Sequence, residues 1–386
     1  MKRLALIVAI GALVAAPTAI ALDRAQARSL LRVAVKLSGL SAREPVRLVA
    51  ERPGPFRQRR VALLDRSYPR AAQDYDEGVY RALGLATGPK GVLRKTLIKL
   101  QDEPGLYDST ARTAYVQAGA GERAAALREV VHGLQDQHVD LSRITRLRGG
   151  DDARTAATAA VEGYASLVTR ELPRRRPALH RAPRLTRFLE LERGFLDSIG
   201  LRFEADLHNL GGSRAAIDSL RRFPATSEQV FHLDKYLQRE PAAPIILPVQ
   251  AAGLTLARHG TFGELDVRAL LAVFGVPRRD QVGSGWGGGR TARYAGPSGE
   301  AVAVALNWDT ALDAAQWAAA VSLYVDAAFD AVPPGSPTPS GCAATTCWQI
   351  GSRAIALDRS GRRSALVIGV DLGPVEALAR ALTGRG

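Results

Sequence analysis

The stretch LREVVHGLQDQH, residues 127–138, decides how the middle of this chain folds. Apolar residues recur in it at helical spacing, and the pattern extends backwards, so we expect one helix over residues 122–137. Residues three and four apart share one face of a helix. Glu129 and His132 should therefore project from the same face, with Arg128 four residues before His132 on that face.

This spacing differs by one residue from a known zinc-binding pattern. In an HExxH helix, two histidines at i and i+4 bind zinc, and the glutamate after the first activates the metal-bound water. Here Arg128 stands at the first histidine position, Glu129 at the general base and His132 at the second ligand. Glu162 lies in the next expected helix, over residues 152–172, from which a carboxylate can return to the same cleft as a third ligand.

Further motifs follow in an order that is typical of one family. On them the chain, over about residues 106–329, resembles the actinobacterial secreted zinc metallopeptidase-like proteins with an HExxH-x-LQDQH core, of the gluzincin type. The resemblance implies a metallopeptidase-like fold and zinc binding through two histidines and a glutamate. The motifs are residues 106–140, Glu162-Gly163, residues 226–232, Lys235-Tyr236, residues 285–288 and residues 308–310.

The sequence departs from the family pattern at the decisive position. Arg128 is always charged and offers no lone pair to a metal. Our hypothesis is that its guanidinium replaces the metal electrostatically, pairs with Glu129 or Glu162, and preserves the fold while abolishing hydrolysis. We expect no cofactor, and zinc only if another residue completes the site. A second departure is Gly289, where the family pattern has an acidic residue.

An alternative keeps a metal-dependent peptidase, with Glu129 as general base and a weaker zinc site. His132 and Glu162 would then need a third ligand, such as Asp136 or His138. Two more residues have cleft-lining roles in our interpretation. Tyr164 lines the cleft beside Glu162 or packs in the core, and His232 lies at the cleft edge or caps a helix.

The N-terminus predicts export. Lys2 and Arg3 precede an apolar run over residues 4–16 and small residues at 19–21, which is the pattern of a secretory signal peptide. We expect it to occupy residues 1–27, with an uncleaved N-terminal anchor as the alternative. No later segment is apolar and long enough for a membrane span. The protein should therefore be secreted or lie in the cell envelope.

The two cysteines, Cys342 and Cys347, support the same compartment. In an oxidising environment such a pair can close a small loop, so we expect a disulfide. A zinc knuckle is the weaker alternative, because two thiolates without a neighbouring histidine make a poor closed site.

The charge indicates anionic surroundings. The chain has 52 Lys and Arg against 38 Asp and Glu, a formal net charge of +14, which favours envelope polymers or lipid headgroups as partners. We expect no nucleic-acid partner, because the charge is spread along the chain and no recognition motif occurs. A basic protein that binds anionic envelope polymers is therefore a further alternative function.

We predict an α+β fold in two parts, a mainly helical metallopeptidase-like domain over residues 28–240 and an α+β portion over residues 241–386. Within them we expect strand-like runs over residues 44–64, a long helix over residues 185–207 and a break at Gly211-Gly212. The C-terminal portion should contain a glycine-rich turn at residues 283–289. Two strand pairs should follow, residues 290–294 with 301–306, and 348–357 with 365–370. The leading function is a secreted, catalytically degenerate metallopeptidase homologue that binds a peptide or protein ligand or has a regulatory role in the envelope.

Overall fold

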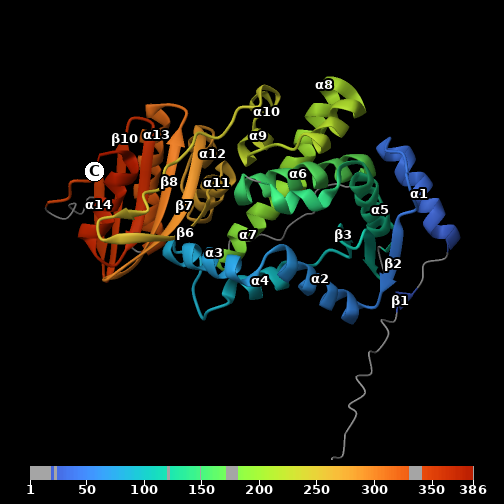
Figure 1. Ribbon diagram of the computed structural model, residues 1–386, viewed down its shortest axis with the longest axis horizontal. Helices are drawn as coiled ribbons and strands as arrows, with labels where there is room; N and C mark the ends of the chain where they lie inside the picture. Colours follow the sequence, from blue (N-terminus) through green and yellow to red (C-terminus); the bar gives the residue numbers. More distant parts are fainter. Residues whose placement is uncertain are drawn as a thin grey trace, which may run out of the picture.

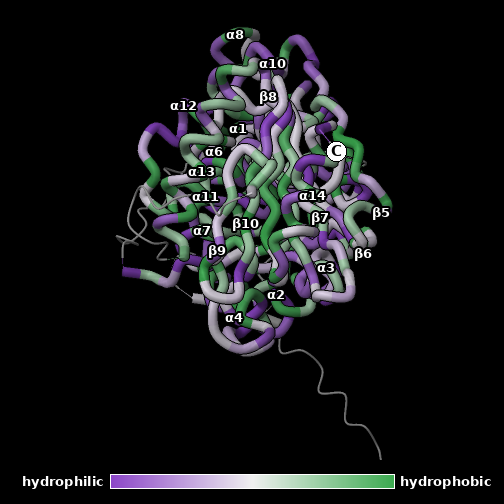
Figure 2. The backbone as a smooth tube through the Cα atoms, turned by 90° about the vertical axis from the view of Figure 1, so that its left-hand side faces the viewer, coloured by the Kyte–Doolittle hydropathy of each residue, from purple (hydrophilic) through white to green (hydrophobic). Residues whose placement is uncertain are grey.

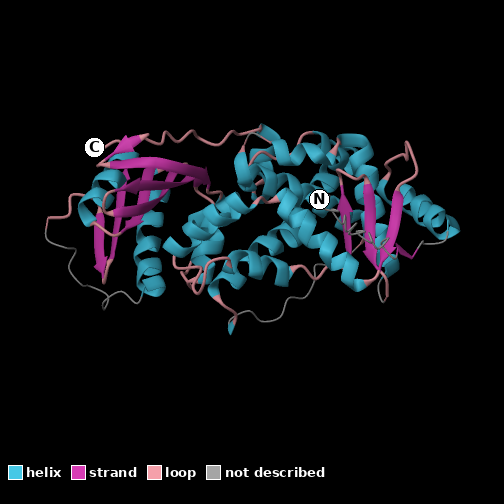
Figure 3. Ribbon diagram, turned by 60° about the horizontal axis from the view of Figure 1, so that its bottom comes forward, coloured by secondary structure: helices cyan, strands magenta, loops and turns pink. Residues whose placement is uncertain are grey.

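The computed structural model describes residues 19–20, 24–119, 122–147, 149–170, 181–329 and 341–385. Helix makes up 57% and strand 19% of the structure, so the predicted α+β class is confirmed. Two sheets lie at opposite ends of the molecule, and helices fill the space between them (Figure 1, Figure 3). The chain therefore builds a helical middle whose two ends are each closed by a sheet.

The N-terminal sheet has the strand order β1-β2-β4-β3. β2 runs parallel to β4, and β3 pairs antiparallel with β4 at the edge. Helix α5 packs on β3 and β4, and α1 packs on α5, so the sheet positions the helix that carries Arg128. The elements are β1 (Ala19–Ile20), α1 (Arg24–Ser38), β2 (Arg47–Glu51), β3 (Gly105–Asp108), β4 (Thr113–Gln117) and α5 (Glu122–Val139).

The expectation for residues 44–64 was only half right. Its first part forms β2, but residues from Pro53 onward form helix α2 (Pro53–Ser67). Pro53 stands in the first turn, where its fixed φ suits a helix and its missing N–H has no partner to lose. Phe56 anchors this helix in the interior, with 1% of its surface exposed. The proline-rich stretch was thus a helix start and not an interruption between strands.

The middle of the molecule is helical, and the long helix expected over residues 185–207 forms as three joined segments. A π-helix over Phe195–Ile199 connects α7 to α8. The predicted glycine break is present inside α8, where Gly212 adopts φ 65°. The helices are α3 (Arg70–Ala82), α4 (Val92–Leu100), a 3-10 helix (Leu141–Arg146), α6 (Gly150–Thr169), α7 (Arg184–Gly194), α8 (Gly200–Arg221), α9 (Ser227–Phe231) and α10 (Leu233–Gln238).

The C-terminal sheet is antiparallel, with the order β5-β6-β7-β8-β11-β10-β9. Larger side chains such as Val304 and Leu357 pack in the core cluster on the α13 face, and small ones such as Ala303 and Ala356 in the cluster on the α14 face. Figure 2 looks onto this end, with apolar stretches running through the strands near β10. The elements are β5 (Gln250–Ala251), β6 (Leu254–Thr261), α11 (Glu264–Val273), α12 (Arg279–Gly283), β7 (Trp286–Gly296), β8 (Gly299–Trp308), α13 (Ala311–Phe329), β9 (Thr346–Ile350), β10 (Arg353–Ser360), β11 (Arg363–Gly369) and α14 (Leu372–Thr383).

The predicted hairpin of residues 290–294 with 301–306 is confirmed as β7 and β8. Two expectations for this portion were wrong. Trp286 to Gly289 begin strand β7 rather than form a turn. The strand expected over residues 348–357 is divided between β9 and β10, because Gly351 adopts φ 59° in the turn between them. Glycine supplies that left-handed conformation without steric cost.

The two predicted parts share one core. The largest apolar cluster joins Tyr75, Leu83 and Phe188 from the helical part to Trp286 and Trp317 from the C-terminal part. Residue 240 therefore does not separate two independent cores, and the two parts should unfold together.

The predicted disulfide is present, between Cys342 and Cys347, and it is compatible with an extracytoplasmic location. Across the described ranges, no helix combines the length and apolar character that a bilayer crossing requires. Most of the predicted signal peptide, residues 1–18 and 21–23, lies outside the described residues.

Candidate functional site

Helix α6 is held close to α8, and this contact orients Glu162. A Cβ atom on Gly163 would lie 2.2 Å from the backbone carbonyl carbon of Gly200, so only glycine allows this approach. With Gly163 facing α8, the neighbouring Glu162 faces α5 and reaches its side chains. The Glu162-Gly163 motif thus combines a packing residue with a charged one.

The predicted pairing of Arg128 with Glu162 is present. Arg128 Nη2 on α5 donates to Glu162 Oε2 at 2.5 Å, and Arg128 Nη1 donates to Ser166 Oγ at 2.9 Å. The Arg128 side chain is 16% exposed and that of Glu162 30% exposed. The guanidinium therefore bridges α5 to two residues one turn apart on α6.

His132 lies at the same carboxylate, and a hydrogen bond with Gln135 fixes the orientation of its ring. Gln135 Nε2 donates to the carbonyl oxygen of Val161 at 3.0 Å, which leaves Gln135 Oε1 to accept from His132 Nδ1 at 2.7 Å. His132 Nδ1 must therefore carry a proton, and Nε2 faces Glu162 Oε2 at 3.4 Å. Holding one ring nitrogen as a donor so that the other faces a site is how proteins orient metal-binding histidines.

The charges of the site stabilise one another. Burial alone would raise the pKa of Glu162, but His132 and Arg128 hold it well below its usual range. Burial alone would lower the pKa of His132, yet Glu162 and Glu129 raise it overall. The carboxylate of Glu162 is therefore ionised at any physiological pH, and it is compensated within the chain.

Glu129 is buried between α5 and the edge strand β3. It is 5% exposed, and a Cβ on Gly105 would lie 2.6 Å from its Oε1. Gly105 in β3 therefore leaves the room that the Glu129 carboxyl group occupies. This places the predicted general base beside the edge strand of the N-terminal sheet.

The side chains at this site do not fit a zinc ion. The guanidinium of Arg128 lies against the carboxylate that would be the third ligand, and it carries no lone pair. The suggested replacement ligands are engaged elsewhere, since Asp136 accepts from Tyr107 and the backbone of Leu141, and His138 Nε2 contacts the Ser41 carbonyl. These contacts tie α5 to its surroundings, which is a structural role for the LQDQH motif.

Within the described residues, two other groups of three potential ligands lie close together, and neither is a free metal site. Cys342 and Cys347 are joined as a disulfide. In the second group, Lys235 Nζ lies 2.5 Å from Glu228, 3.1 Å from Glu240 and 2.7 Å from Asp309. The lysine itself supplies the cation there.

Tyr164 and His232 lie in surroundings of their own. Tyr164 is 1% exposed and packs in the core cluster beside α1, where its hydroxyl donates to the Ser38 carbonyl oxygen at 2.5 Å. This agrees with core packing and not with a cleft-lining side chain. His232 Nε2 lies 3.1 Å from Glu264 Oε1 on α11, and this contact raises the pKa of His232.

The tryptophans of the remaining family-like motifs lie in the core cluster that the two parts of the fold share. Trp286 Nε1 donates to the Phe262 carbonyl, and Trp308 Nε1 donates to Ser364. A Cβ on Gly289 would lie 2.0 Å from the Phe262 carbonyl oxygen, so no side chain fits at this position. The second departure from the family pattern therefore has a steric reason in this structure.

Sequence reasoning missed the residues that support the site. Ser166 stands one helical turn after Glu162, and Gln135 stands three residues after His132. Helical spacing alone would have placed both near the site. Neither belongs to the three-ligand pattern, so the motif gave no reason to select them.

Comparison with known proteins identifies the C-terminal part only. Residues 253–379 match a domain of unknown function (DUF8575). No curated protein and no solved structure matches the chain. The match begins just before β6 and ends in α14, so it leaves α5 and α6 outside.

Proposed function

We propose that this chain is a metallopeptidase-like protein that binds an extended peptide without hydrolysing it, and in which Arg128 takes the place of the zinc ion. The observation that carries the proposal is the contact of Arg128 Nη2 and His132 Nε2 with one carboxylate oxygen, Glu162 Oε2. Arg128, His132 and Glu162 thus meet at one point, and they occupy the positions of the two histidines and the glutamate of a zinc site. Arg128 carries a positive charge at the position of the first histidine.

The chemistry of the side chains explains why hydrolysis should be lost. In zinc peptidases the ion lowers the pKa of a bound water and polarises the substrate carbonyl. A guanidinium can stabilise negative charge, but it cannot bind water as a ligand and lower its pKa in that way. Glu129 would then be a base without an activated water to deprotonate.

A peptide ligand is supported by the position of β3. Among the described strands, β3 pairs with β4 alone, so it is the edge strand of this sheet. An extended peptide can add to such an edge through main-chain hydrogen bonds. Because Glu129 packs against Gly105 of β3, a peptide added there would pass close to the Arg128 site. The disulfide is compatible with an extracytoplasmic place of action.

A fluorescent peptide library tests the proposal. Purified protein and a Glu129→Gln variant are incubated with the library, with and without a metal chelator, and anisotropy and product masses are recorded. We expect retained peptides, no cleavage, and no effect of the chelator. Cleavage that disappears both with the chelator and in Glu129→Gln would instead support the alternative of a metal-dependent peptidase.

A further inference from the structure

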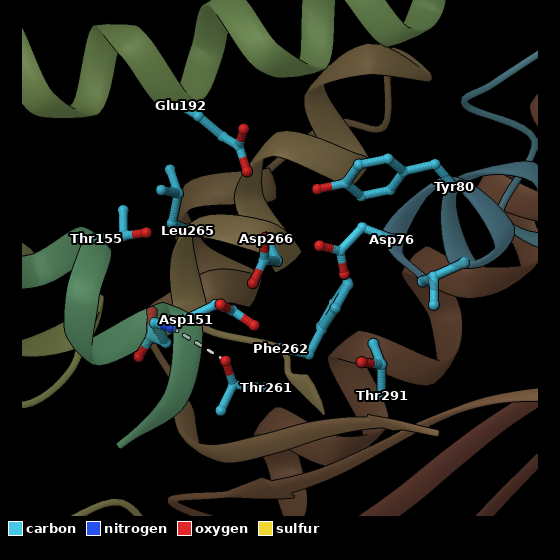
Figure 4. Close-up of a pocket in the computed structure, with 12 residues that line it drawn as sticks. Asp76, Tyr80, Asp151, Thr155, Glu192, Thr261, Phe262, Leu265, Asp266 and Thr291 are labelled. Carbon is cyan, nitrogen blue, oxygen red and sulfur yellow. Dashed lines mark hydrogen bonds between the residues drawn. The ribbon is translucent and has the colours of Figure 1, made fainter. Parts of the chain in front are cut away.

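A second polar site lies in the helical middle, away from Arg128. A partly open cavity of about 70 Å³ is lined by residues of α3, α6, α7 and α11, together with Thr261 at the end of β6 and Thr291 in β7 (Figure 4). One water needs about 10–15 Å³ by this measure, so the cavity has room for roughly five waters or a group of similar size. Its lining contains five acidic residues, Asp76, Asp151, Asp152, Glu192 and Asp266.

Four of the five acids have a partner. Asp76 accepts from the Tyr68 hydroxyl, and Asp151 is paired with Arg154. Asp152 accepts from the backbone of Ser227 at 3.1 Å, and Asp266 from the backbone of Gly263 at 2.7 Å. These contacts fix the side chains, but three of them use neutral donors, and within the described part of the chain a basic partner is paired with Asp151 alone.

Glu192 is different. Among the described residues, no donor forms a hydrogen bond or ion pair with its carboxyl group. Figure 4 shows this group directed into the cavity, towards Asp266 and Asp76. Glu192 is partly accessible, and the burial of its carboxyl group, with Asp266 and Asp76 nearby, raises its pKa well above the usual value.

The arginines near the cavity do not offset its excess of acidic groups. Arg258 and Arg154 lower the pKa of Asp76, but burial raises it overall. Burial and the neighbouring Asp152 and Asp76 raise the pKa of Asp266 to about 8. Among the residues that the structure describes, Glu192 thus has an unpaired carboxyl group in this cavity, and the neighbouring Asp266 lacks a basic partner.

We propose that this cavity binds a primary ammonium group, with Glu192 and Asp266 as its acceptors. An ammonium group has three N–H donors and matches carboxylates that face one another. The apolar and aromatic walls, Val79, Leu265, Phe262 and Tyr80, suit the attached alkyl chain, and aromatic faces attract cations.

A bare divalent cation fits less well. Calcium is bound by several oxygens, each at 2.3–2.6 Å from the ion, which brings the oxygens close to one another. Within the described residues, the groups of three ligands whose atoms lie within 4.8 Å of one another occur elsewhere in the molecule. The wider spacing of these acids favours a larger cation. The ammonium group can belong to a free diamine or to the side chain of a lysine in a partner.

Calorimetric titration tests the proposal with four probes, n-butylammonium, 1,4-diaminobutane, Nα-acetyl-lysine amide and calcium chloride. We expect butylammonium to bind at pH 7.5, and the affinity to rise between pH 6 and pH 8, because ligand binding must displace protons from the acids. Preference for the diamine or for the lysine amide distinguishes the two sources of the ammonium group.

Two variants and a control complete the test. Glu192→Gln and Asp266→Asn should each weaken butylammonium binding by about tenfold or more, since each loses a charged acceptor. Both should fold, because each removes one of several like charges. Asp326→Asn on α13 removes one carboxylate away from the cavity and should leave the affinity unchanged.

Three results would overturn the proposal: no ammonium probe binds the wild-type protein, calcium binds and the ammonium probes do not, or Glu192→Gln binds butylammonium as tightly as wild type. None of them bears on the Arg128 site, because the two sites share no residue.

Discussion

Two places in the helical part enclose carboxylates, and they differ in the source of the opposite charge. At the Arg128 site, a guanidinium and an imidazole of the chain meet Glu162, and the pKa of that acid lies well below its usual range. In the cavity beside α7, Glu192 and Asp266 have no basic partner among the described residues, and the pKa of Asp266 is raised to about 8. A site whose cation is part of the chain is complete, whereas a site without one is suited to an external cation.

The largest expected effect comes from removing the internal cation. Arg128→Met should lower the free energy of unfolding by about 2–3 kcal/mol at neutral pH, because it leaves the carboxylate of Glu162 without that charge. Breaking a fully buried ion pair typically costs about 3–5 kcal/mol, and Glu162 is 30% exposed, which reduces the effect. Urea denaturation measures the change.

Arg123→Met is the matched control, because this arginine lies exposed on the same helix. Its stability should change by less than about 0.5 kcal/mol. If Arg128→Met changed the free energy of unfolding as little as Arg123→Met, the guanidinium would not compensate the carboxylate of Glu162. The contrast between the two places would then fail.

A smaller, pH-dependent effect is expected in the cavity. The pKa of Asp266 in the folded state, about 8, exceeds its unfolded value of about 3.9. The folded protein therefore binds an extra proton between these values, and stability from this group falls as pH rises towards 8. Asp266→Asn does not titrate, so its stability relative to wild type should increase by about 1–2 kcal/mol between pH 6.5 and pH 8.

Urea denaturation of both proteins at the two pH values measures this difference, with Asp326→Asn as a control that should show no pH-dependent gain. A difference between Asp266→Asn and wild type that stays constant with pH would mean that the acid is already compensated, and the cavity would then resemble the Arg128 site.

The sequence predicted the parts of this fold that depend on local pattern. Helical periodicity located α5 and α6, and the pairing of Arg128 with Glu162 followed from the departure from the HExxH pattern. The residues after Pro53 were misjudged, because the same proline-rich stretch suits a break or a helix start, and the buried Phe56 decides between them only in three dimensions.

The acidic cavity could not have been predicted. Its acids come from α3, α6, α7 and α11, which are far apart in the chain. Each of them resembles an ordinary surface residue in its own helix, and only the packing of the four helices brings them together. The same reason hid the shared core, in which Leu83 and Phe188 meet Trp317.

The claim that Arg128 takes the place of zinc is tested most directly by elemental analysis of metal content. Wild-type protein and an Arg128→His variant are purified identically, in the presence of equal zinc. We predict no stoichiometric zinc in wild type and about one equivalent in the variant, since histidine would complete a two-histidine, one-glutamate set. Stoichiometric zinc in wild type, or a folded variant without zinc, would contradict the account.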